Sequence, residues 1–152
     1  SHTCALTRAG AAWCRGGNGA GQAGATSGDG HVQGLPNDIV QLAADADTTC
    51  ARSDAGDIYC WGSFGAYDYA NAGAPPALPR KLRAAAPAKD LAVGRNYACV
   101  ILTDDRVACG GLDANRQLGA ILPSYERSPG WHCTNKAWFE AGETRDLEAV
   151  AW

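Results

Sequence analysis

The chain has 152 residues, with 13 Lys and Arg against 16 Asp and Glu, a formal net charge of −3 at pH 7 and a sequence pI of about 5.5. This length accommodates one ordinary hydrophobic core. The acidic balance provides no basic stripe to neutralise a phosphate backbone, so we expect no nucleic-acid partner. No apolar run approaches the roughly 18 residues of a membrane span, so we expect membrane contact only through a parent protein, if at all. The absence of Met and of a recognisable signal peptide indicates a processed product or a segment of a longer protein.

The first predicted element is a β-hairpin closed by Cys4 and Cys14. Pairing these cysteines leaves residues 8–10 as the loop, with Gly10 in the last position. A three-residue hairpin loop needs its last residue in the left-handed region, where glycine has no steric penalty. Directly opposed cysteines at a non-hydrogen-bonded pair can reach disulfide distance. We therefore predict a disulfide across this hairpin.

Two more cysteine pairs have the same separation of ten residues: Cys50 with Cys60, and Cys99 with Cys109. The equivalent loop-final residues are Gly56 and Asp105, and aspartate is one of the few other residues that tolerate the left-handed conformation. We therefore predict three hairpin disulfides in one register, each contributing roughly 3 kcal/mol by constraining the unfolded chain. Zinc binding is the alternative use of these cysteines, but the sequence contains no close Cys-x2-Cys pair. The regular spacing favours disulfides in an oxidising compartment.

Short apolar segments separate the hairpins. We predict strands over residues 39–44, 89–93 and 147–151, with Gly and Pro punctuation and no helical periodicity, which is typical of an all-β array. Gly19, Gly21 and Gly24 match the spacing of a dinucleotide-binding loop, but no helix-forming sequence follows them, as such a loop requires. We interpret these glycines as tight turns and expect no cofactor.

Neither catalysis nor metal binding has a complete residue set in this sequence. His132 and Cys133 are adjacent, but neighbours in an extended strand point to opposite faces, so they do not form a nucleophile and base pair. His2 and His31 lack companions at ligand spacing, and the acidic pairs at 45/47 and 104/105 do not match a calcium loop. We therefore expect no catalytic residue and no metal site.

The segments His2–Leu6, Trp13–Gly16 and Gly21–Gly24 read His-Thr-Cys-Ala-Leu, Trp-Cys-x-Gly and Gly-Gln-x-Gly. This pattern resembles the RCC1-type repeat, in the cysteine-paired variety found in secreted bacterial proteins and in extracellular receptor and surface proteins. The resemblance covers essentially the whole chain as three repeats, at about 1–45, 46–94 and 95–152.

The resemblance implies an all-β fold, a partial β-propeller of about three RCC1-like blades, each a four-stranded antiparallel sheet. Usually about seven such blades close the ring, so we expect the chain to be part of a larger propeller or to complete one with other chains. The aromatic residues beside the second cysteines, Trp13, Tyr59 and Trp61, would then pack between blades.

The third repeat is longer than the others because of the segment Pro123–Thr144. Insertions in repeat arrays map to loops on one face, often the binding face, and this one concentrates residue types that anchor interfaces. A simple packing role is the alternative. The candidate interface residues are Tyr125, Arg127, Trp131, His132, Cys133, Trp138 and Phe139. Because the other six cysteines are matched, we expect Cys133 to bond outside these 152 residues or to be a free thiol.

These features predict a non-enzymatic interaction or structural module of a secreted, cell-surface or periplasmic protein, binding a protein partner through blade loops. One alternative is an inhibitor of an extracellular enzyme, since some proteins of this family cap an active site with a propeller face. Another is guanine-nucleotide exchange on a nuclear GTPase, the best-known activity of the family. The protruding element for that activity has no match here, and paired cysteines and an acidic pI count against a nuclear site.

Overall fold

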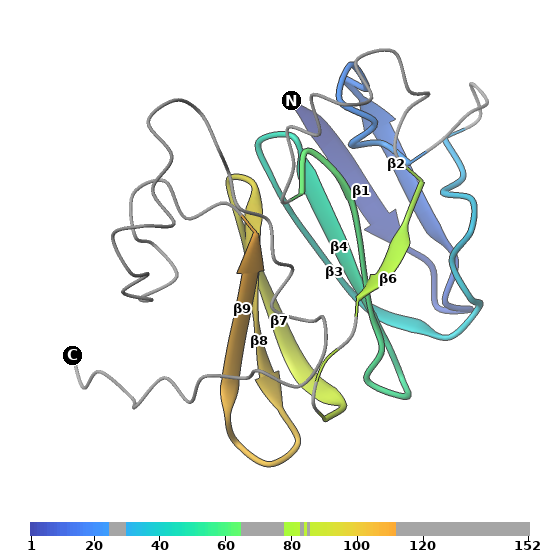
Figure 1. Ribbon diagram of the computed structural model, residues 1–152. Helices are drawn as coiled ribbons and strands as arrows, with labels where there is room; N and C mark the ends of the chain where they lie inside the picture. Colours follow the sequence, from blue (N-terminus) through green and yellow to red (C-terminus); the bar gives the residue numbers. More distant parts are fainter. Residues whose placement is uncertain (25–29, 65–77, 83, 85, 112–152) are drawn as a thin grey trace, which may run out of the picture.

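The structure is a computed structural model that describes residues 1–24, 30–64, 78–82, 84 and 86–111. Within these residues it is entirely β, with three antiparallel sheets arranged side by side (Figure 1). The same residues contain no helix long and apolar enough to cross a membrane. The first sheet is β1 (His2–Leu6) and β2 (Ala12–Gly16); the second is β3 (Ile39–Asp45), β4 (Thr48–Ser53), β5 (Ile58–Gly62) and β6 (Arg80–Leu82); the third is β7 (Ala88–Gly94), β8 (Tyr97–Leu102) and β9 (Val107–Gly111).

The predicted hairpin register is confirmed in all three sheets. Each pair of cysteines stands directly opposite across its hairpin and forms a disulfide, with Cα–Cα distances of 4.1, 4.1 and 4.0 Å in chain order. The loop-final residues also adopt the expected left-handed conformation, with φ of 82° at Gly10, 85° at Gly56 and 68° at Asp105. The turn residues and the cysteine spacing therefore produce the same hairpin in all three sheets.

The glycines at the hairpin tips also permit close packing against the following sheet. A Cβ on Gly10 would lie 2.2 Å from the main-chain oxygen of Asn37, two residues before β3 begins. A Cβ on Gly56 would lie 2.6 Å from the side chain of Pro87, just before β7. The main-chain N of Ala88 donates to the oxygen of Gly56 at 2.9 Å. Each of these tips therefore supports the segment that leads into the next sheet.

The sheets do not coincide with the repeats expected at about 1–45, 46–94 and 95–152, from which they differ by one strand. The predicted strands over 39–44 and 89–93 are present as β3 and β7, and each pairs with the hairpin that follows it. The second sheet has the four strands that the resemblance implies, whereas the first and third have two and three among the described residues. An isolated bridge between Trp13 and His31 extends the first sheet beyond β2. The predicted strand over 147–151 lies outside the described residues.

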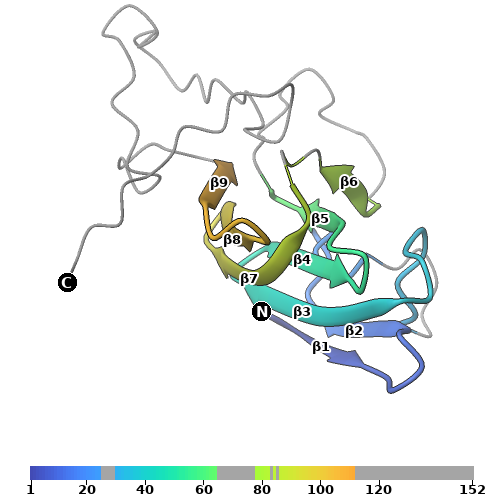
Figure 2. The same cartoon turned by 90° about the horizontal axis from the view of Figure 1, so that it is seen from below.

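Two hydrophobic clusters lie between the sheets, and we call these two contact zones the first and second seam. The first seam joins the β1–β2 sheet to the β3–β6 sheet, and the second joins the β3–β6 sheet to the β7–β9 sheet (Figure 2). Their fully or almost fully buried members are, in the first seam, Ala12, Cys14, Ala23, Val32, Ile39, Ala51 and Trp61, and in the second, Cys50, Ile58, Cys60, Ala88, Leu91, Ala98, Val100, Leu102 and Ala108. Because strand side chains alternate between faces, the first two disulfides point toward the following sheet and become part of seam packing.

The aromatic residues beside the second cysteines have different surroundings. Trp61 is 1% exposed and lies in the first seam, as predicted, and Tyr59 packs against the same cluster. Trp13 is 39% exposed, because no sheet packs on its face of the first sheet among the described residues, so its packing between blades stays a prediction. Its side chain lies on the face of the first sheet that points away from the second sheet, where it contacts His31 edge-on at a ring separation of 5.1 Å.

Candidate functional site

One end of the three sheets gathers their polar connections, and we call it the loop end. Strands β2, β5 and β9 finish there at Gly16, Gly62 and Gly111 (Figure 1). The β3–β4 turn reaches the same end, since the main-chain N of Ser63 donates to the oxygen of Asp47 at 2.8 Å. The third repeat continues from Gly111 at this end. The candidate interface residues lie outside the described residues: Tyr125, Arg127, Trp131, His132, Cys133, Trp138 and Phe139.

The centre of the polar structure at the loop end is Gln22, which is 4% exposed. Its main-chain oxygen accepts two hydrogen bonds from the second sheet, from Thr49 Oγ1 at 2.8 Å and from Trp61 Nε1 at 2.9 Å. A buried carbonyl has two lone pairs, and here both have a donor. The loop that follows β2 is thereby fastened to the β4–β5 hairpin across the first seam.

The side chain of Gln22 completes this joint. Its Nε2 donates to Asp47 Oδ1 at 2.7 Å, and its Oε1 accepts from the main-chain N of Ala20 at 2.9 Å. Among the described residues no buried side-chain nitrogen or oxygen lacks a hydrogen-bond partner. A buried network in which every polar group is hydrogen-bonded favours one packing of the two sheets. Any shift of one sheet against the other would leave a polar group without a partner.

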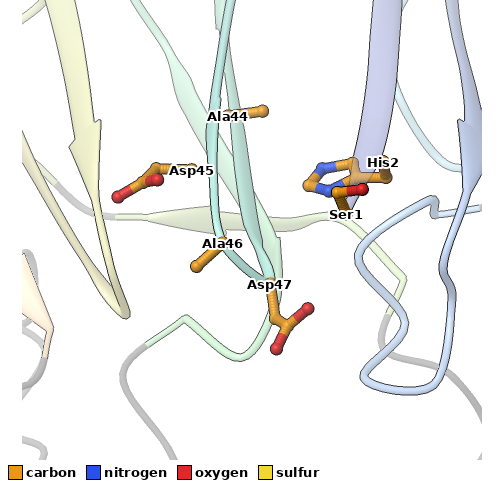
Figure 3. Close-up of a pocket in the computed structure, with 6 residues that line it drawn as sticks. All are labelled: Ser1, His2, Ala44, Asp45, Ala46 and Asp47. Atoms are coloured by element: carbon orange, nitrogen blue, oxygen red, sulfur yellow. The ribbon is translucent and has the colours of Figure 1, made fainter.

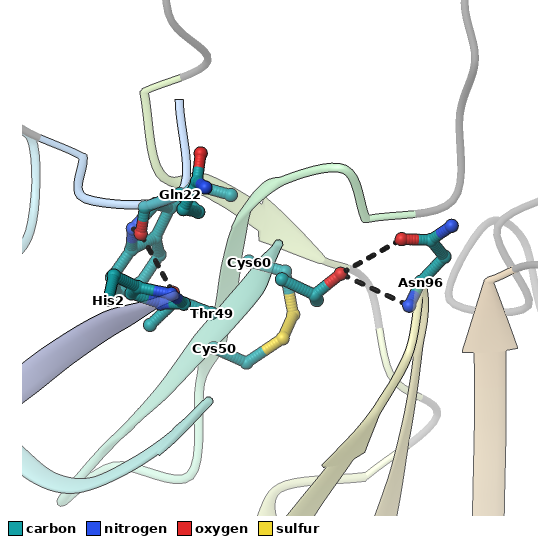
Figure 4. Close-up of a disulfide and its surroundings, with 8 residues drawn as sticks. His2, Gln22, Thr49, Cys50, Cys60 and Asn96 are labelled. Carbon is teal, nitrogen blue, oxygen red and sulfur yellow. Dashed lines mark hydrogen bonds between the residues drawn. A yellow bond between two sulfur atoms is a disulfide. The ribbon is translucent and has the colours of Figure 1, made fainter. Parts of the chain in front are cut away.

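His2 joins the same network from β1. Its Nε2 lies 2.6 Å from Thr49 Oγ1 (Figure 4). Because the single hydroxyl proton of Thr49 is donated to Gln22, Thr49 accepts from His2, which assigns the neutral ring as the tautomer with a proton on Nε2. Burial lowers the pKa of His2 from 6.5, against the smaller raising effects of the Ala46 carbonyl and of Asp47. Burial thus favours the neutral imidazole, whereas the Ala46 carbonyl and Asp47 favour the protonated ring.

A cavity of about 370 Å³ opens beside this joint, lined by Ser1, His2, Ala44, Asp45, Ala46 and Asp47. Figure 3 shows the imidazole of His2 facing the β3–β4 turn, with the carboxylates of Asp45 and Asp47 pointing in different directions. Within the part of the chain that the structure describes, no group of three or more His, Cys, Asp or Glu could hold a metal ion. His2 contributes to the first seam through its hydrogen bond with Thr49.

The second seam uses different polar contacts. Gln41 Nε2 donates to Asp90 Oδ1 at 2.7 Å and to the oxygen of Leu91 at 3.1 Å, while Arg52 Nε donates to Gln41 Oε1 at 3.0 Å. The hydrogen bond from Gln41 lowers the pKa of Asp90 below its usual value, with a further contribution from the main-chain N of Leu91. At the loop end, the main-chain N of Asn96 donates to Thr48 Oγ1 at 3.2 Å (Figure 4). The two seams are therefore chemically distinct.

Four-stranded antiparallel sheets that stack face to face and share strands between sequence repeats are blades of a β-propeller. Comparison with solved structures shows the RCC1-type propeller fold that the sequence resemblance implied. The chain is similar to Prp20p from Saccharomyces cerevisiae, at 23% identity and a TM-score of 0.63, over 82% of this chain and 33% of that one. It is also similar to human WBSCR16, at 22% identity and a TM-score of 0.58, over 73% of this chain and 31% of that one.

Yeast RCC1 in its complex with Kap60 gives a comparable likeness, at 21% identity and a TM-score of 0.57, over 74% of this chain and 30% of that one. The chain thus spans about a third of the length of these structures. No protein-family model and no curated protein sequence matches the chain. The likeness to solved structures establishes the fold.

The joint at Gln22 was not predicted from the sequence, because the glycines around Gln22 were interpreted as tight turns. The sequence feature that could have revealed this joint is that Gln22 occurs together with Thr49 and Trp61 of the following repeat. In the third repeat the positions of Thr49 and Trp61 are occupied by Ala98 and Gly110, and the loop before it lacks the glutamine. The first seam therefore has the glutamine and both donors, whereas the second seam has neither the glutamine nor the donors.

Proposed function

We propose that the chain is a non-enzymatic protein-interaction module of a secreted, cell-surface or periplasmic protein, which binds its partner through loops at the loop end. The feature that supports this proposal is the insertion of the third repeat, which follows β9 in the sequence. The repeat leaves β9 at Gly111, beside Asn96 of the β7–β8 turn, and Pro123–Thr144 follows in the sequence. Loops on a rigid β scaffold are the usual carriers of binding residues.

Solved propellers with this fold support a role in protein binding. Prp20p is described together with its binding to Gsp1p and histones, and yeast RCC1 is bound to Kap60. For this chain we infer a protein partner, or further propeller blades from other segments or chains, and no nucleic acid. The three disulfides support an oxidising compartment, since such bonds persist mainly in secreted and periplasmic proteins.

The role of the insertion in binding is tested by replacing its aromatic residues. Trp131→Ala or Trp138→Ala should weaken capture of a partner from secreted material by on the order of 2 kcal/mol, because aromatic anchors at interface centres dominate binding. Trp13→Ala is the matched control, since Trp13 is an exposed tryptophan outside the insertion. Binding of the captured partner is then measured by calorimetry.

Two outcomes would contradict the proposal. Either a folded chain that lacks Pro123–Thr144 binds the partner normally, or the control variant weakens binding as much as the two insertion variants. A panel of extracellular proteases and lactamases distinguishes the related hypothesis of an enzyme inhibitor. Stoichiometric inhibition of one enzyme would make that enzyme the partner.

A further inference from the structure

The loop that follows β2, residues 17–24, contains a glycine that the fold does not require. Gly21 and Gly24 in this loop have positive φ values of 76° and 60°, which glycine adopts without steric penalty. The φ of Gly19 lies outside the positive range, and a Cβ built on this residue would meet no atom within 4 Å. Gly19 is also exposed. A side chain would fit here, so the lack of one affects the chemistry of the neighbouring residue and not the packing.

The residue before Gly19 is Asn18, whose side-chain amide can react with the main chain. In an Asn-Gly sequence the glycine nitrogen can add to the amide carbon Cγ of the asparagine, because no Cβ on the glycine hinders the approach. The main-chain N of Ala23 donates to Asn18 Oδ1 at 2.9 Å. A donor on this oxygen stabilises the negative charge that develops there when a nucleophile adds to Cγ. The hydrogen bond from Ala23 therefore activates the carbon that Gly19 would attack.

The main-chain nitrogen of Gly19 can act as this nucleophile without loss of a hydrogen bond. The N–H groups of Ala20, Gly21 and Ala23 each donate a hydrogen bond within the loop. The N–H of Gly19 has no partner among the residues that the structure describes. Its proton can therefore pass to solvent while the hydrogen bonds that shape the loop stay in place.

We propose that Asn18 and Gly19 form a self-modifying site, at which deamidation in the folded chain produces an isoaspartyl linkage and loosens the first seam. Hydroxide removes the proton from the Gly19 nitrogen, which then adds to Cγ of Asn18. The bond from Cγ to Nδ2 breaks, and Nδ2 leaves as ammonia, so that a succinimide ring remains. Water opens this ring in one of two ways. Addition at Cγ gives an aspartyl residue, and addition at the main-chain carbonyl carbon gives the isoaspartyl linkage.

The two products differ in their effect on Gln22. The isoaspartyl linkage adds one carbon to the main chain between β2 and Gln22, and it removes from the main chain the Asn18 oxygen that accepts from the N of Gly21 at 3.0 Å. The carbonyl of Gln22 should then no longer reach both of its donors in the second sheet. An aspartyl residue keeps the main chain unchanged, and its carboxylate can still accept from the N of Ala23. The isoaspartyl product is therefore the one that loosens the seam.

The site is tested by incubating the folded 152-residue chain at mildly alkaline pH. Reduction and tryptic digestion release residues 16–52 as one peptide, in which mass spectrometry detects the exchange of NH₂ for OH and distinguishes the two products. Asn37 in the same peptide is the internal control, because it is exposed but precedes Asp38 instead of a glycine. Asn18 should convert at least about tenfold faster than Asn37, because only its neighbour lacks a Cβ.

Two variants separate the chemistry from the fold. Gly19→Ala should slow the conversion of Asn18 at least about tenfold without lowering the urea midpoint, because a Cβ fits at this position. Asn18→Asp carries the charge of the products on a normal main chain. The isoaspartyl form, separated by chromatography, should unfold at a lower urea concentration than the Asn18→Asp variant.

Three outcomes would overturn the proposal. In the first, Asn18 of the folded chain converts no faster than Asn37. In the second, the Gly19→Ala variant converts as fast as the unaltered chain. In the third, the isoaspartyl form and the Asn18→Asp variant unfold at the same urea concentration. None of these measurements involves a binding partner, so their outcome is independent of the proposed function.

Discussion

The joint at Gln22 predicts a non-additive response when its two donors are removed. Thr49→Val removes the hydroxyl with little change of shape, and Trp61→Phe removes the indole N–H. Either change alone leaves the buried carbonyl of Gln22 with one donor, and the loss of that hydrogen bond should cost about 1 kcal/mol. Thr49→Val also removes the acceptor of His2 Nε2, so its effect should be the larger of the two hydrogen-bond losses. The double variant leaves this carbonyl without a partner, which should add a further ~1–2 kcal/mol beyond the sum of the single effects.

The assay is urea unfolding of the chain with its disulfides intact, followed by Trp fluorescence and circular dichroism. A double-mutant cycle cancels the packing volume that Trp61→Phe removes, provided that both single variants remain folded. Thr3→Val is the control, because Thr3 is the exposed counterpart of Thr49 and its replacement should change stability by less than about 0.5 kcal/mol. Strict additivity in the cycle, or a Thr49→Val effect as small as the control, would refute the reasoning.

Three further predictions concern other parts of the fold. Burial lowers the pKa of His2 in the folded chain, so on acidification the unfolded chain binds the His2 proton first. Urea midpoints should therefore fall as the pH drops below 6.5. His2→Gln should lose that part of the pH dependence. Gly56→Ala should cost at least about 1 kcal/mol more than Gly34→Ala, because both glycines have positive φ but a Cβ meets neighbouring atoms only at Gly56. Cys50→Ala combined with Cys60→Ala should cost roughly 3 kcal/mol or more in unfolding free energy, and peptide mapping of the unaltered chain should show no bond between cysteines of different hairpins.

The hairpins could be predicted from the sequence because their determinants are local. Ten-residue cysteine spacing and a left-handed residue in the last position of the hairpin loop leave a single register, and the φ of 68° at Asp105 shows that this holds without glycine. The seams were predicted less well because they depend on stacking. Gln22 and its two donors are 27 and 39 residues apart in sequence, and only the approach of two sheets makes them partners.

The exposure of Trp13 also depends on sheet stacking and could not be predicted from the local sequence. Its place directly before Cys14 matches that of Tyr59 before Cys60, yet Trp13 is exposed whereas Tyr59 packs against the first seam. The difference arises entirely from what stacks on each sheet, and nothing within the repeat encodes it. The candidate interface residues in Pro123–Thr144 remain predictions from the sequence, because they lie outside the described residues.

The one-strand offset between repeats and sheets has a consequence for dividing or extending the chain. A cut at the repeat boundary after residue 45 would separate β3 from β4, which form one sheet, whereas a cut between β2 and β3 would keep that sheet whole. The repeat expected from the sequence is therefore not the unit that forms one sheet. Adding one repeat would leave every junction bridged by a strand from the neighbouring repeat. Arrays of this kind can lengthen in evolution, or in a designed concatemer, without creating a free-standing blade at any step.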